Sequence, residues 1–259
     1  MRKKINHFCP FQADLMRAFS SWRFYFSILA GFLFFSRQLF MRYSHWQFLT
    51  PMEMLSIPLA ISDFTPFAVV FCAFPFSDSF CHDYSTKYLF FISSRIDIRR
   101  YARCRCAAVA ACGGVVMASI IILTINICVI GAGKSETVES LLFLQGTIWG
   151  KMGVLHVCGG VFHYLGRVFL AFLFGAVWAL AALTISVFVT NPYVTVLSPF
   201  VVYQVLWFLL EGLPINPVYL LRADYGGIPS FSFVVIVQCL CILFCSVVAC
   251  WGIKRKVLV

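Results

Sequence analysis

The segment Cys128–Ser135, CVIGAGKS, comes closest to a known chemical motif in this chain. A phosphate-binding loop follows the pattern G-x-x-x-x-G-K-[ST], and Gly133, Lys134 and Ser135 match its end. The first glycine position is occupied by Cys128, and an apolar run precedes the segment where the motif needs a strand. We therefore interpret the glycines as a helix end, where glycine supplies left-handed backbone, and expect no nucleotide to bind there.

Cysteine and histidine are frequent enough to raise the question of a metal site or a catalytic group. The chain has 12 cysteines and 5 histidines. Their spacing gives no C-x-x-C pair, no H-E-x-x-H, and no G-x-S-x-G around a serine. Most of the cysteines lie inside apolar runs, where a free thiol behaves as a small hydrophobic group. The sequence therefore predicts no catalytic residue, no metal ligand and no cofactor bound by this chain.

The composition indicates the environment in which the chain folds. Hydrophobic residues make up 61% of the 259 residues and charged residues only 12%. A soluble domain has about 45–50% apolar and about 25% charged residues. These values argue against a soluble enzyme, a disordered chain and a nucleic-acid-binding domain, and they favour a membrane protein.

Six apolar runs are long enough to cross a bilayer, which takes about 20 residues. Continuous runs of this length favour helices over barrel strands. The sequence therefore predicts an all-α polytopic membrane protein with one transmembrane domain over residues 1–259. Residues 6–21 mix aromatic and charged side chains, as expected for an amphipathic helix on the membrane surface. The predicted spans cover about residues 22–40, 55–76, 104–130, 162–189, 194–210 and 231–253.

Most of the 20 lysine and arginine residues fall in segments that share one side if the N-terminus is cytoplasmic. By the positive-inside rule we expect both termini in the cytoplasm, together with the long loop 77–103. The net charge of +10 then reflects orientation and contact with anionic lipids rather than nucleic acid. Segment 131–161 falls on the outer side, where we expect a re-entrant or surface-lying element.

Polar residues inside the spans are candidates for a substrate path, because polar groups in lipid are costly. Asp63 in the second span fits either a path or the outer interface. Asn126, Gln204 and Gln238 also lie in spans, and for these three we favour hydrogen bonds between helices. We keep Asp63, Asn126 and Gln204 as the candidate path residues.

In the loop 77–103, Asp78 and Asp83 follow the second span, the next stretch ends near Arg95, and Arg100 and Tyr101 lead into the third span. This order is similar to a motif in the permease subunits of type-2 ABC exporters. In that family an acidic residue follows the second span. A stretch ending near an arginine comes next, and then a tyrosine and basic residues enter the third span. The usual glycine after the acidic residue is replaced here by Ser85 or Thr86. The residues that we assign to this coupling motif are Asp78, Asp83, Tyr84, Arg95, Arg99, Arg100 and Tyr101.

Two later segments resemble further landmarks of the same family, in the same order. Ser186, Asn191 and Pro199 correspond to the serine, asparagine and proline around the start of the fifth span. Pro214 and Pro217 correspond to the outer proline segment before the sixth. The order of landmarks over nearly the whole chain identifies it as similar to the ABC-2 type transporter family.

The resemblance implies a permease subunit of an ATP-driven exporter in the inner membrane of a prokaryote. Loop 77–103 would form a coupling element that docks on a separate ATPase, and residues 6–21 a connecting helix. ATP and Mg²⁺ would be bound by that partner. A second permease chain, identical or paralogous, would complete the path for an apolar or amphipathic substrate.

Two other classes of function remain open from the sequence. A membrane assembly or immunity protein with no transport cycle would also lack catalytic residues. A secondary transporter driven by ions would require Asp63 to titrate within the pathway.

Overall fold

The computed structural model describes residues 10–41, 55, 59, 64–93, 97–131, 160–222 and 231–258. All regular structure within these residues is helical. The helices are α1 (Pro10–Phe19), α2 (Trp22–Phe40), α4 (Phe64–Ala73), α5 (Ser79–Ser85), α6 (Tyr88–Ser93), α7 (Ile98–Gly131), α10 (Gly160–Phe188), α11 (Pro192–Leu209), α12 (Pro217–Arg222) and α13 (Phe231–Leu258).

Four of these helices, α7, α10, α11 and α13, are long and apolar enough to cross a membrane. A fifth candidate is α2, which qualifies together with α1 across a bend of 54°. The prediction of an all-helical, multi-pass membrane protein is confirmed at this level. In the predicted second span the structure describes Leu55, Leu59 and residues 64–76, which include α4, so the remainder of 55–76 before α4 lies outside the described residues.

Helices α7 and α10 form the centre of the bundle and meet at two glycines. A Cβ atom added at Gly113 would lie 2.7 Å from the carbonyl oxygen of Gly175 and 3.1 Å from that of Cys72. Small residues at such a crossing let two backbones approach closely, as in many membrane bundles. The candidate spans in α7 and α10 are 61% and 67% buried, against 17% for α11 and for α13. The latter two helices are therefore peripheral and leave apolar faces for lipid.

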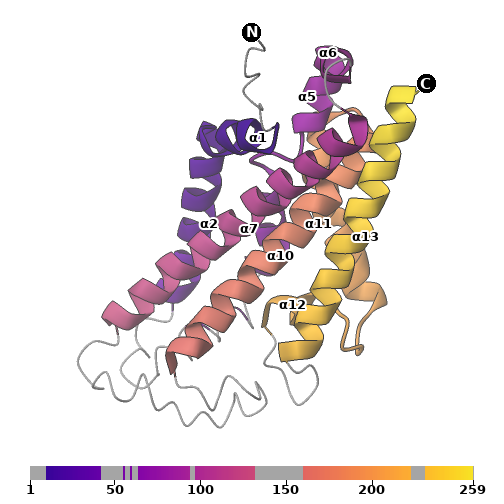
Figure 1. Ribbon diagram of the computed structural model, residues 1–259. Helices are drawn as coiled ribbons and strands as arrows, with labels where there is room; N and C mark the ends of the chain where they lie inside the picture. The colour runs from indigo at the N-terminus through magenta and orange to yellow at the C-terminus, as the bar shows by residue number, and fades with distance from the viewer. Residues whose placement is uncertain are drawn as a thin grey trace.

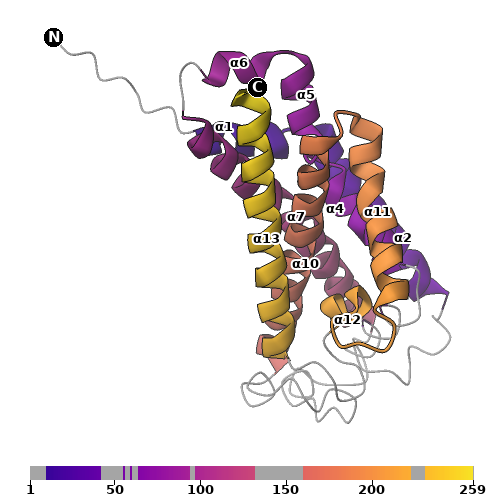
Figure 2. The ribbon, with the colours of Figure 1, turned by 90° about the vertical axis from the view of Figure 1, so that its right-hand side faces the viewer.

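The two ends of the bundle differ in what they carry (Figures 1 and 2). Helices α1, α5 and α6 gather at one end, where α13 also finishes, while α12 lies at the other. At the α12 end, Gln238 Nε2 donates to the carbonyl of Leu220 at 2.6 Å, and Arg167 Nη1 donates to that of Leu221 at 3.4 Å. These two side chains bind backbone carbonyls that a helix end leaves unpaired. The prediction of a hydrogen bond between helices for Gln238 is confirmed.

Helix boundaries follow local signals that are visible in the sequence. Ser21 caps α2 by accepting from the backbone N–H of Arg23 at 3.3 Å. Asn191 caps α11 by accepting from the N–H of Tyr193 at 3.0 Å. Helix α7 already begins at Ile98, so it includes the last residues of the loop that we placed at 77–103. Most of segment 131–161 lies outside the described residues.

Candidate functional site

The most unusual side chain in the structure is Arg105, on the first turns of α7, because it is fully buried. Arginine is almost never fully buried unless it is paired. Its Nη1 donates to Asp14 Oδ1 of α1 at 2.8 Å, and its Nη2 forms an ion pair with Asp83 of α5. One guanidinium therefore holds carboxylates from two other helices.

Two further side chains complete this arrangement. Arg17 of α1 places Nη2 at 3.2 Å from Asp83 Oδ1 and Nη1 at 3.9 Å from Asp14 Oδ1. The hydroxyl of Tyr101 donates to Asp83 Oδ2 at 3.1 Å. We call Asp14, Arg17, Asp83, Tyr101 and Arg105 the charge cluster. Its two cations balance its two anions, so the burial of charge is compensated within the cluster.

Local structure explains how these side chains converge. Asp14 and Arg17 are three residues apart on α1 and therefore share a face. The guanidinium of Arg105 lies 5.1 Å from the ring centre of Phe76 and 5.4 Å from that of Tyr101. These rings help to exclude water from the charges, which strengthens their attraction. Burial raises the pKa of Asp14, and the charge of Arg105, followed by that of Arg17, opposes the rise.

Helix α5 makes contacts beyond the charge cluster. Asp78, just before α5, accepts from Arg23 Nη1 of α2 at 2.7 Å. The thiol of Cys81 lies 3.5 Å from Thr195 Oγ1 and 3.6 Å from the carbonyl oxygen of Val189, at the turn between α10 and α11. Burial raises the pKa of this thiol, so it stays protonated and can donate.

The end of α13 also reaches α5. Lys256 Nζ lies 5.0 Å from the centre of the Tyr84 ring, which stacks on Phe80. Including the charge cluster and the contacts of Asp78 and Cys81, α5 is therefore linked to α1, α2, α7, α10, α11 and α13. A short helix at the end of the bundle touches nearly every long element described.

The structure places the predicted coupling residues in different surroundings. Asp83 and Tyr101 are buried, with 1% and 3% of their surface exposed, so they brace α5 from inside and cannot touch a docked protein. Arg99 and Arg100 are exposed on the first turn of α7. Asp78 and Tyr84 bind Arg23 and Lys256 as described above, and Arg95 lies outside the described residues.

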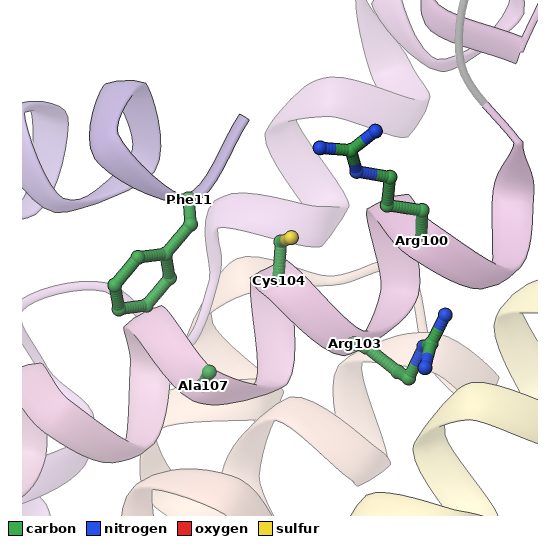
Figure 3. A pocket seen from close by; sticks show the side chains of 5 residues that line it. All are labelled: Phe11, Arg100, Arg103, Cys104 and Ala107. Atoms are coloured by element: carbon green, nitrogen blue, oxygen red, sulfur yellow. The ribbon is translucent and has the colours of Figure 1, made fainter. Parts of the chain in front are cut away.

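Arg100 and Arg103 also border a groove between α1 and α7 (Figure 3). The groove is shallow and open, has a volume of about 380 Å³, and is lined mainly by apolar atoms. In the close-up, Phe11 approaches from α1, while Cys104 and Ala107 lie along α7. The two guanidinium groups extend from α7 at one end of the groove. The groove presents positive charge beside an apolar floor.

The candidate path residues do not converge in the described part of the chain. Asp63 lies outside it. Asn126 is exposed on α7 and donates back to the carbonyl of Ile122 in its own helix at 2.8 Å. Gln204 is half-buried on α11. No hydrogen bond joins Asn126 to Gln204 within the described residues.

Sequence reasoning missed Asp14, Arg17 and Arg105 as functional candidates. One signal was available, because Arg105 interrupts the start of an apolar span and a charge there needs a partner. Comparison of the chain with protein-family models, curated proteins and solved structures finds no match in any of the three. What the chain does must therefore be inferred from α5 and the charges around it.

Proposed function

We propose that this chain is the permease subunit of an ATP-driven ABC exporter, and that α5 and α6 receive the motion of a separate ATPase. The observation that carries the proposal is the position of α5. It lies at the end of the bundle and is bound by ion pairs to α1 and to the central helix α7. A docking element needs such connections, because a force on it must reach the spans.

The charge cluster suits the transmission of force. Removing one member of a buried ion pair costs about 3–5 kcal/mol, so a partner that pushes α5 moves α1 and α7 before the cluster separates. Rigid-body shifts of helices are a common way in which two global states interconvert. ATP binding by the partner would favour one state over the other by acting on this body.

The outer side of α5 and α6 has the composition of a docking surface. Tyr88 is 46% exposed and Phe91 71% exposed, beside exposed polar side chains of His82, Thr86 and Lys87. Exposed aromatic anchors with a polar rim are typical of binding hot spots. The turn between the two helices has Lys87 at a φ of 58°, the left-handed region that favours glycine.

Further parts of the proposal follow from the resemblance. Six spans would be completed by residues before α4, with both termini in the cytoplasm of a prokaryotic cell. A second permease chain would pair with this one. ATP and Mg²⁺ would be bound by the ATPase, and an apolar or amphipathic substrate would move outward between the permeases.

Co-purification with matched variants tests the docking surface. The full chain is purified in mild detergent, and bound chains are identified by mass spectrometry. We expect an ATP-binding chain to accompany the wild type and to be lost with Phe91→Ala. Phe208→Ala is the control, because Phe208 is 77% exposed on the peripheral helix α11. Equal recovery of the ATPase with both variants would refute docking at α6.

A further inference from the structure

Two cysteines from different helices face each other one residue away from the charge cluster. The sulfur atoms of Cys106 on α7 and Cys250 on α13 lie 3.9 Å apart. Cys106 directly follows Arg105 in α7. Each cysteine lies about two helical turns from the end of its helix that is near α5. The pair therefore lies between the two helices just inside the end of the bundle that carries α5.

The two thiols differ in how easily a reagent reaches them. Cys106 is 4% exposed, whereas Cys250 is only half-buried. A small oxidant would therefore meet Cys250 first, with Cys106 behind it as the nearest thiol. A disulfide requires the sulfur atoms to approach to about 2.05 Å, and a rotation of either side chain about χ1 changes their separation. Redox-sensor cysteines are often accessible thiols that lie next to a second cysteine able to form the disulfide.

We propose that Cys106 and Cys250 are a redox-sensitive site, in which peroxide joins α7 to α13 by an intramolecular disulfide. The Cys250 thiol gives up its proton and attacks hydrogen peroxide, which breaks the O–O bond and leaves a sulfenic acid and one water. The Cys106 sulfur then attacks that sulfenic sulfur, forms the S–S bond and releases a second water. The two thiols are oxidised by two electrons and the peroxide is reduced by two.

The disulfide would be reversible where the cysteines face a reducing cytoplasm, because thiols there reduce most disulfides. While it lasts, α13 cannot slide along α7. The same helix α13 contacts α5 through Lys256 and Tyr84. Any effect of the disulfide on transport rests on the proposed function, but its formation does not.

Peptide mapping of the oxidised full chain tests the proposal without an ATPase. The chain is purified under reduction, treated with hydrogen peroxide, alkylated and digested. We expect a cross-linked peptide that contains Cys106 and Cys250, that has lost the mass of two hydrogen atoms, and that a thiol reductant separates. Cys250→Ala, at a half-buried position, should abolish it.

Two control variants make the result specific. One is Cys104→Ala, because Cys104 lies two positions from Cys106 on another face of α7. The other is Cys239→Ala, because Cys239 is exposed on α13. Both should leave the cross-link unchanged. The proposal would be overturned if Cys250 were oxidised to the sulfinic acid with no cross-link. It would also be overturned if the disulfide formed with another cysteine or between two chains. The wild-type map decides these outcomes, so a poorly folded variant cannot obscure them.

Discussion

Replacement of Arg105 by methionine should destabilise the protein, because Arg105 is the fully buried cation of the charge cluster. Methionine keeps an unbranched apolar side chain, although a shorter one, and removes the charge that binds both Asp14 and Asp83. Asp83 retains Arg17 at 3.2 Å, but Arg17 is 44% exposed and compensates only in part. Asp14 loses its 2.8 Å partner, and its Oδ2 is already buried without a hydrogen bond among the described residues.

Loss of one member of a buried ion pair costs about 3–5 kcal/mol, and we expect this decrease in the free energy of unfolding. It can be measured by titrating the detergent-solubilised chain with SDS and following helix content. The free energy of unfolding of Arg105→Lys should lie between those of the wild type and Arg105→Met, because lysine carries the charge but lacks the planar set of donors that binds two carboxylates. Adding Asp14→Asn and Asp83→Asn to Arg105→Met should recover much of the loss, since no buried charge is then uncompensated. A decrease below about 0.5 kcal/mol for Arg105→Met, or no recovery in the triple variant, would refute a paired and buried cluster.

Three further experiments test the turn after α5, the hydrogen bond at α12 and the role of Asp63. Lys87→Gly should raise the free energy of unfolding by about 0.5–1 kcal/mol, because glycine adopts the left-handed backbone at this position without the steric cost of a Cβ atom. Thermal unfolding measures the change, and a lower free energy of unfolding would contradict the turn geometry. Gln238→Leu should lower the free energy of unfolding by about 1 kcal/mol, because it leaves the Leu220 carbonyl unpaired. Gln204→Leu is the control and should change the free energy of unfolding by less than about 0.5 kcal/mol. Equal effects of the two variants would argue against the hydrogen bond at α12. Asp63→Asn should leave substrate export intact when the proton gradient is collapsed, as measured in membrane vesicles supplied with ATP; a requirement for Asp63 and the gradient would favour an ion-coupled transporter instead.

Apolar run length predicted several helices well. The runs at 22–40, 162–189 and 194–210 correspond to α2, α10 and α11, each within about two residues at either end. Such runs can be recognised in the sequence because a membrane-spanning helix needs a continuous apolar stretch of about 20 residues. The start of α7 was less evident. The arginines that follow Ile98 favoured a loop in the sequence, although they belong to the first turns of the helix. Hydropathy marks where lipid begins and not where a helix begins.

The charge cluster could not be derived from spacing along the chain. Arg105 and Asp14 are separated by 91 positions, and Arg17 and Asp83 by 66. Helical periodicity predicts neighbours three or four residues apart, and tertiary packing decides the remainder. From the sequence, Asp83 and Tyr101 were assigned to the motif in loop 77–103 and were expected to contact a docked protein. Their burial shows that they brace α5 instead.

The same distinction applies to the cysteines. The spacing of the cysteines in the sequence indicated no metal site and no disulfide, and the described cysteines lie within helices. Cys106 and Cys250 are 144 positions apart, so only the antiparallel packing of α7 and α13 brings their sulfur atoms together. A pair of this kind becomes visible only once the fold is known.

The central claim is that this chain works with an ATPase that acts on α5 and α6. The most direct measurement is the mass and composition of the complex purified from its native membrane in mild detergent, followed by an assay of ATP hydrolysis. We predict a complex that contains an ATP-binding chain together with two permease chains and that hydrolyses ATP. A preparation that contains only this chain, with no ATP-binding partner and no hydrolysis, would contradict the claim and favour a membrane protein without a transport cycle.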